Sequence, residues 1–134
     1  MGRRCHLVGQ RGLSRAGHLG LSQHGLIHGH RDHGREKSEV LIPDEAHGTN
    51  PSSAAIAGYS TRSVPTRTDT GMLDLDALRR MVGPRTAAVM LTNPNTLGIF
   101  NTGIREVVDI AHRHNALVYY DGANLNAVLG KFRP

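Results

Sequence analysis

One apolar run in this chain ends abruptly in a carboxylate, and this feature constrains the fold more than any other. Residues 116–120 read Ala-Leu-Val-Tyr-Tyr, and Asp121 and Gly122 follow directly. A short run of this kind, without polar alternation, indicates a strand that is covered on both faces, as in a parallel sheet. Ligands of open parallel α/β sheets bind just beyond the carboxyl ends of the strands. Asp121 is therefore placed either to meet a ligand or to cap the following turn.

Further apolar runs alternate with helical patterns along the rest of the chain. Strands are expected over residues 39–43, 59–64, 86–91 and 116–120, and helices over 51–57, 75–82, about 103–114 and, as a short start, 125–129. Asn50 and Asp74 are the predicted N-caps of the first two helices, and Gly58 is the predicted end of the first. Asn115 is predicted to end the third in a left-handed conformation. This alternation predicts an α/β fold, with a mostly parallel sheet and flanking helices.

Residues 1–38 differ in texture from residues 39–134. They contain six of the nine histidines, recurrent glycines and apolar residues without a clear period. We interpret 1–38 as an irregular His/Gly/Arg-rich segment, disordered or frame-shifted, and 39–134 as part of a larger domain. Two other interpretations stay open: a mitochondrial-type transit peptide, and a metal site formed by His24, His28 and His30.

The charge distribution excludes some classes of partner. Residues 1–38 hold seven Lys and Arg side chains against two acidic ones, whereas residues 39–134 hold nine of each. The net charge of +5 therefore belongs to the first segment, and we expect no nucleic-acid-binding surface. No apolar run approaches membrane-spanning length, so no membrane partner is expected either. The single Cys5 rules out an internal disulfide and suits a reducing compartment.

Three of the expected strands end in polar loops, which contain His47, Asn95 and Asp121. If these strand ends share one edge of the sheet, the three side chains can converge. An imidazole that stacks on a flat ring, an amide that binds a ring hydroxyl and an acid beside a ring nitrogen are the parts of a pyridoxal phosphate site. Each also has an ordinary interpretation: a solvated loop histidine, a turn asparagine and a capping aspartate. A metal site and a Ser-His-Asp hydrolase site have less support, because neither ligand spacing nor a Gly-x-Ser-x-Gly motif is present.

Three long motifs resemble one known family. They are Leu-Ile-Pro-Asp-Glu-Ala-His-Gly-Thr-Asn-Pro-Ser-Ser-Ala (41–54), Ala-Ala-Val-Met-Leu-Thr-Asn-Pro-Asn-Thr-Leu-Gly (87–98) and Tyr-Tyr-Asp-Gly-Ala-Asn-Leu-Asn-Ala-Val-Leu-Gly-Lys-Phe-Arg-Pro (119–134). Together they resemble glycine dehydrogenase (decarboxylating), the P-protein of the glycine cleavage system, in its second subunit or C-terminal half. The resemblance covers about residues 39–134.

This resemblance implies a fragment of the large domain of a fold type I pyridoxal phosphate enzyme. The family decarboxylates glycine and passes the aminomethyl group to the lipoyl arm of the H-protein. Its implied partners are the P-protein subunit 1 or N-terminal half and the lipoylated H-protein. By position, His47 corresponds to the ring-stacking residue and Asp121 to the partner of the pyridine nitrogen. Asn95 and Asn124 correspond to polar neighbours of the ring hydroxyl, and Thr49 and Asn50 are substrate candidates.

The family's Schiff-base lysine lies downstream of the Gly-Lys-Phe-Arg-Pro segment, so no catalytic residue is assigned here. Only Lys37 and Lys131 are present, and Lys131 matches a different family position. We therefore expect residues 1–134 alone to be inactive. The alternatives are a non-catalytic remnant and another fold type I enzyme. The expected compartment is the cytoplasm for a bacterial source and the mitochondrial matrix for a eukaryotic one.

Overall fold

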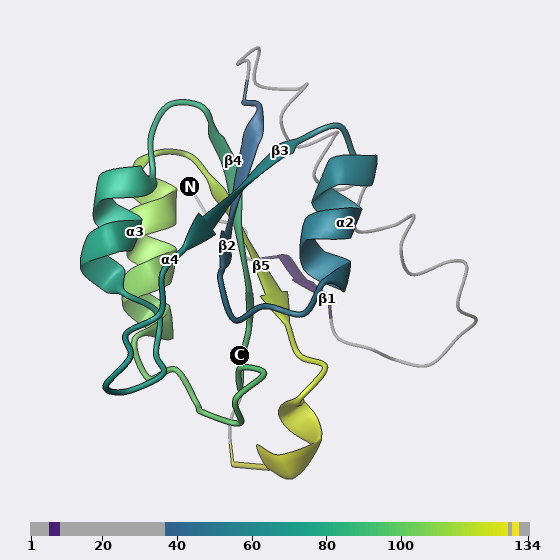
Figure 1. Ribbon diagram of the computed structural model, residues 1–134, viewed down its shortest axis with the longest axis vertical. Helices are drawn as coiled ribbons and strands as arrows, with labels where there is room; N and C mark the ends of the chain where they lie inside the picture. Colours follow the sequence, from purple (N-terminus) through teal and green to yellow (C-terminus); the bar gives the residue numbers. More distant parts are fainter. Residues whose placement is uncertain (1–5, 9–36, 129, 132–134) are drawn as a thin grey trace.

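The computed structural model describes residues 6–8, 37–128 and 130–131. Its centre is a parallel five-stranded sheet with the order β1-β5-β4-β2-β3 (Figure 1). The strands are β1 (His6–Val8), β2 (Glu39–Pro43), β3 (Ser60–Val64), β4 (Thr86–Thr92) and β5 (Leu117–Asp121). The expected α/β fold with a mostly parallel sheet is thus confirmed.

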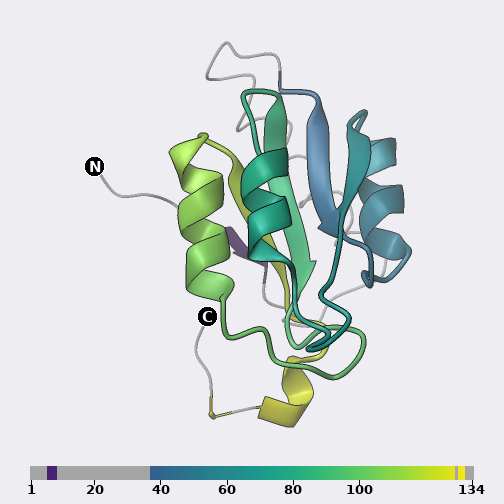
Figure 2. The same ribbon diagram turned by 60° about the vertical axis from the view of Figure 1, so that its left-hand side comes forward.

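Helices cover both faces of the sheet. Helix α2 (Thr49–Ile56) lies on one face, and α3 (Leu75–Met81) and α4 (Ile104–Arg113) lie side by side on the other (Figures 1 and 2). A short 3-10 helix, η1 (Leu125–Val128), follows β5. Each crossover connects parallel strands. The chain runs from β2 outward to the edge strand β3 and then back to β4 and β5, and the helices change face with this reversal. This arrangement creates a topological switch point between β2 and β4, where ligands of such sheets bind.

The core forms two layers, one on each face of the sheet. Leu41, Val89 and Val118 point toward α3 and α4, where they pack with Leu78 and Val107. Their strand neighbours point the other way and pack with Ala54 of α2; among them are Val40, Ile42, Ala88 and Met90. All residues of β2 and β4 are buried, which explains why these strands show no polar alternation.

Several predicted helix ends are confirmed. The Asp74 side chain accepts hydrogen bonds from the backbone N–H groups of Asp76 and Ala77, so it caps α3. Gly58 has a φ of +86° and its N–H donates to the Ala55 carbonyl, which closes α2. Asn115 has a φ of +54° after α4, in the predicted left-handed conformation.

Three expectations differ from the structure. Gly48, not Asn50, is the N-cap of α2, and Asn50 lies within the helix with its side chain turned toward the sheet. Asp121 is the last residue of β5 and not the first residue beyond it. Strand β1 was not expected within residues 1–38, but it pairs with β5 from His6 opposite Tyr119 to Val8 opposite Asp121. The remaining residues of this segment, with His24, His28 and His30, lie outside the described part of the chain.

Among the helices of the described residues, none combines the length and the apolar character needed to cross a bilayer.

Candidate functional site

The carboxyl edge of the sheet brings Asp121 together with two other polar side chains. Asp121 on β5 lies opposite Thr92 on β4 in the parallel register. The Thr92 hydroxyl donates to Asp121 Oδ2 at 3.2 Å. Asn50 Nδ2, from the first turn of α2, donates to Thr92 Oγ1 at 3.3 Å and to the same Asp121 oxygen at 3.5 Å. We refer to these three residues as the Asn50–Thr92–Asp121 cluster.

The alternation of side chains along β4 and β5 explains this placement. Val89 and Leu91 pack toward α3 and α4, whereas Met90 packs on the opposite face, so Thr92 also belongs to the α2 face. Along β5, Val118 packs toward α4 and Tyr119 on the α2 face, which places Asp121 there as well. Two neighbouring parallel strands thus end with polar residues in register, directly below the start of α2.

Asp121 is half-buried and has no cationic partner among the described residues. Its other oxygen, Oδ1, accepts from the Ala123 backbone N–H at 3.0 Å, so the predicted turn-capping role is present too. The capping bond uses Oδ1 and the cluster uses Oδ2. The turn-capping role therefore does not exclude a second role for this carboxylate. The carboxylate of Asp121 also affects Tyr119: burial, and then the negative charge of Asp121, raises the pKa of the Tyr119 phenol.

His47 lies exposed in the loop between β2 and α2. Its Nδ1 atom is 3.0 Å from the Thr49 hydroxyl and 3.3 Å from the Thr49 backbone N–H. Because a backbone N–H can only donate, Nδ1 is the accepting nitrogen of the ring. Thr49 thus orients the imidazole at the start of the helix that contributes Asn50 to the cluster.

The side chain of Asn95 organises its own loop. It is buried, its Oδ1 atom accepts from the N–H groups of Leu97 and Ile99, and its Nδ2 atom donates to the Gly71 carbonyl at 2.8 Å. Asn124 Nδ2 donates to the carbonyls of Pro94 and Asn95 at 3.1 and 3.2 Å. Asn124 therefore holds the loop after β4 against the segment after β5, whereas Asn95 attaches that loop to the segment before α3. The contact of both amides with a ring hydroxyl stays a prediction.

The loops after β2 and β4 are tied to each other across the switch point. The Thr96 hydroxyl donates to the Glu45 carbonyl and lies 3.2 Å from the Glu45 carboxylate. Burial raises the pKa of Glu45 more than the hydrogen bonds from Thr96 lower it. Glu45, which has a reduced tendency to ionise, thus joins these two loops and lies two residues before His47 in the sequence.

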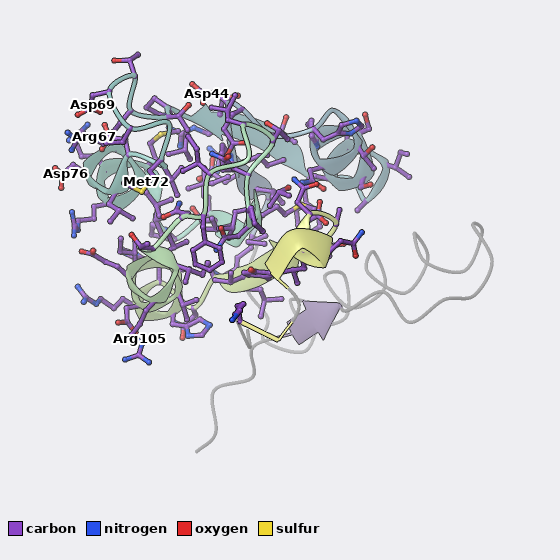
Figure 3. All side chains as sticks on the ribbon, turned by 90° about the horizontal axis from the view of Figure 1, so that it is seen from below. Asp44, Arg67, Asp69, Met72, Asp76 and Arg105 are labelled. Atoms are coloured by element: carbon purple, nitrogen blue, oxygen red, sulfur yellow. The ribbon has the colours of Figure 1, made fainter. Side chains whose placement is uncertain are left out.

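A separate groove of about 390 Å³ lies at the start of α3. Figure 3, which views this edge from below, shows Arg67, Met72 and Asp76 gathered there, on the side away from η1. The arginines of the groove are paired: Arg67 with Asp69 at 2.9 Å, and Arg79 with Asp76 and Glu106. None of the predicted site residues lines this groove, so we do not assign it to the site.

Thr92 is the residue of this edge that sequence reasoning did not single out. The signal was present: Thr92 ends an otherwise apolar run, just as Asp121 does, and parallel neighbouring strands end side by side. Among groups of His, Cys, Asp and Glu in the described residues, none could hold a metal ion. Lys131 is exposed, as a surface lysine would be.

Comparisons with known proteins agree with the fold and with the motifs. The chain is 58% identical over 99 residues to the "probable glycine dehydrogenase (decarboxylating) subunit 2" of Methylococcus capsulatus, which covers 74% of this chain and 20% of the relative. A relative of the same name from Thermococcus gammatolerans is 57% identical over 106 residues, or 78% of this chain and 21% of the relative. The chain thus spans about a fifth of the length of these curated relatives.

A solved structure shows the same fold at low sequence identity. The sphingosine-1-phosphate lyase of Burkholderia pseudomallei has a TM-score of 0.70 and 20% identity, and the match covers 84% of this chain and 27% of that one. The expected resemblance and the fold type I architecture are thereby confirmed. A family model described as aminotransferase class-V matches residues 22–127. The chain therefore belongs to the class-V aminotransferase family.

Proposed function

We propose that this chain contributes to the pyridoxal phosphate site of a glycine-decarboxylating P-protein. The observation that carries the proposal is the half-buried Asp121 carboxylate at the end of β5, hydrogen-bonded by Thr92 and Asn50 and without a cation among the described residues. An acid in this setting suits the protonated nitrogen of a pyridine ring. The similarity to glycine dehydrogenase (decarboxylating) subunit 2 supports the choice of substrate.

The residues present fit this cofactor. Asp121 would accept a hydrogen bond from the ring N–H and keep the proton on that nitrogen. His47, whose imidazole is oriented by Thr49, would stack on the ring. Asn95 and Asn124 would lie near the ring hydroxyl, and Thr49 and Asn50 near the substrate. When bound, pyridoxal phosphate supplies an electron-withdrawing ring that accepts the electron pair released on loss of carbon dioxide.

The proposed reaction also needs other components. With pyridoxal phosphate held by these residues, glycine would lose carbon dioxide, and its aminomethyl group would be transferred to the lipoyl arm of the H-protein. We propose the lipoylated H-protein and the P-protein subunit 1 or N-terminal half as partners. The Schiff-base lysine would come from the segment that follows these motifs in the family.

A chimera tests this proposal directly. Residues 39–131 replace the aligned stretch of the Methylococcus capsulatus relative, to which this chain is 58% identical. Together with subunit 1 of the same relative, the chimera should release carbon dioxide from carboxyl-labelled glycine only when lipoylated H-protein is present. In the same chimera, Asp121→Asn should abolish this release, because the ring nitrogen loses its acid. A folded chimera that binds pyridoxal phosphate but releases no carbon dioxide from glycine would contradict the glycine reaction and favour another fold type I activity.

A further inference from the structure

The hydroxyl of Thr92 occupies the centre of the Asn50–Thr92–Asp121 cluster. It receives a hydrogen bond from Asn50 Nδ2 at 3.3 Å and donates one to Asp121 Oδ2 at 3.2 Å. Thr92 is 4% exposed and Asn50 is 5% exposed, so bulk water does not substitute for these contacts. Since the Asn50 amide nitrogen can only donate, the direction of the Thr92 hydroxyl is set toward the carboxylate.

Donors from three separate parts of the fold therefore hold the Asp121 carboxylate. Asn50 comes from α2, Thr92 from β4, and the Ala123 N–H from the turn after β5. An aspartate side chain without such donors can rotate about both of its side-chain torsions. With Oδ2 and Oδ1 each restrained, the carboxylate plane has one orientation, and a ligand meets an acceptor that is already in place.

We propose that Thr92, supported by Asn50, is a positioning residue that orients Asp121 toward the nitrogen of the cofactor ring. This inference rests on the proposed function, since it assumes that Asp121 meets a pyridine nitrogen. Neither Thr92 nor Asn50 needs to touch the ring nitrogen: both act through the carboxylate. The proposal changes the role of Asn50 from a substrate candidate to a residue whose amide is engaged with Asp121.

The competing explanation is that the cluster only attaches α2 to the sheet. Helix α2 already has an apolar attachment, because Ala54 is buried against the sheet residues Val40, Ile42 and Met90. A purely structural role predicts that loss of the hydroxyl weakens every ligand of the site equally. A positioning role predicts a loss that is specific to ligands with a ring nitrogen. The two explanations therefore differ in a measurable ratio.

The experiment compares two ligands on the full 134-residue chain. Equilibrium dialysis gives the Kd of pyridoxal phosphate and of an analogue in which a C–H group replaces the ring nitrogen. We expect the wild-type chain to prefer pyridoxal phosphate by tenfold or more, because a hydrogen bond to a charged group contributes roughly that factor. Thr92→Val should reduce this preference to about twofold. Thr92→Ser, which keeps the hydroxyl, should restore it.

Two further variants separate positioning from folding. Asn50→Ala removes the weaker donor and should reduce the preference by about threefold, which also tests the cluster if Thr92→Val fails to fold. Thr61→Val is the matched control, because Thr61 is exposed on β3 and should keep the wild-type ratio. Circular dichroism and the urea midpoint verify that each variant is folded.

The outcomes distinguish the two proposals. If the wild-type chain shows no preference between the ligands, Asp121 does not meet the ring nitrogen, and the proposed function fails together with this inference. If the wild type has the preference and a folded Thr92→Val and Asn50→Ala retain it, the positioning role is overturned while the proposed function stands. A preference that falls in both variants and returns in Thr92→Ser supports the positioning role.

Discussion

Strand β4 begins with Thr86 and ends with Thr92, and these two threonines bind carboxylates with different surroundings. Thr86 Oγ1 donates to Glu39 Oε1 on β2 at 3.2 Å, and Thr92 Oγ1 donates to Asp121 Oδ2 on β5 at 3.2 Å. Both hydroxyls are buried, and each holds the carboxylate of a neighbouring strand. The residue type, the bond and the distance are the same at the two edges of the sheet.

The surroundings of the two carboxylates differ. Glu39 is 6% exposed and pairs with the Arg62 guanidinium at 3.5 Å. Beside it, the buried Lys37 ammonium donates to the carbonyls of Thr86 and His114. A buried charge is costly unless it is paired, and at the amino ends of β2 and β4 the charged side chains have partners within the protein. Asp121 is half-buried and has no cation among the described residues, and its oxygens accept hydrogen bonds from neutral donors.

Substitution of Asp121 or of Glu39 should affect ligand binding very differently. Asp121→Asn should lower the preference for pyridoxal phosphate over the nitrogen-free analogue by about ten- to a hundredfold, because the amide cannot provide a charged acceptor. Glu39→Gln, the matched variant at the other edge, should keep the wild-type preference. Dialysis with both ligands measures the ratio. An equal loss in the two variants would show that the edges do not differ in this way.

The second prediction concerns stability, and here the larger effect is expected at Thr86 rather than near Asp121. Thr86→Val should lower the free energy of unfolding by about 1–3 kcal/mol, because the Gly83 N–H and the buried Glu39 both lose their hydroxyl partner. Thr92→Val should cost less than about 1 kcal/mol, since Asn50 keeps its contact with Asp121. Urea unfolding of both variants gives the comparison. A larger cost at Thr92 would mean that the carboxyl edge is the structural one.

A third prediction concerns Glu45, in the loop that follows β2 at the carboxyl edge of the sheet. Burial raises the pKa of Glu45 above its ordinary value of 4.5, so the folded chain binds this proton more tightly than the unfolded chain. Its contribution is fully present below the unfolded pKa and is lost as the pH rises through the folded pKa. Glu45→Gln does not titrate, so its stability relative to wild type should increase from pH 4 toward neutrality. Unfolding curves at several pH values would contradict this if the difference stayed constant.

The smallest expected effect is on Tyr119. The Asp121 charge is the lesser of the two causes that raise the pKa of this phenol, after burial. Asp121→Asn should therefore lower the pKa of Tyr119 only partly toward its ordinary value. Carbon NMR of labelled tyrosine can follow the three tyrosines separately. Glu39→Gln serves as the control, and a shift of equal size in that variant would contradict the local cause.

Much of the fold follows from local patterns. The all-apolar run Ala87–Leu91 predicted a fully covered strand, and the structure buries each of its residues. Asp74 and Gly58 satisfy backbone groups within their own helix ends, so their roles depend on neighbours in the sequence. Such interactions are local, and a sequence pattern can therefore reveal them.

The sequence predictions were wrong where a residue can interact either with its neighbours in the sequence or with a distant partner. Asn50 could have capped α2, but its amide instead contacts Thr92 and Asp121, which lie 42 and 71 residues away. The tertiary contact also satisfies a buried group, which the cap would not have done. Strand β1 is three residues long, too short for a sequence pattern to reveal, and its pairing with β5 identifies it as a strand.

Local patterns in residues 39–128 account for the order of strands and helices there, the burial of β2 and β4, and the carboxylate at the end of β5. These features depend on hydrophobic period and local backbone preference, which act over a few residues. The hydrogen bonds from Thr92 and Asn50 to Asp121 and the pairing of Glu39 with Arg62 follow from the tertiary arrangement, in which Asp121 has no cation among the described residues. Crossover helices separate these groups by tens of residues in the chain, so no local pattern reveals their contact. The register between parallel strands brings them together.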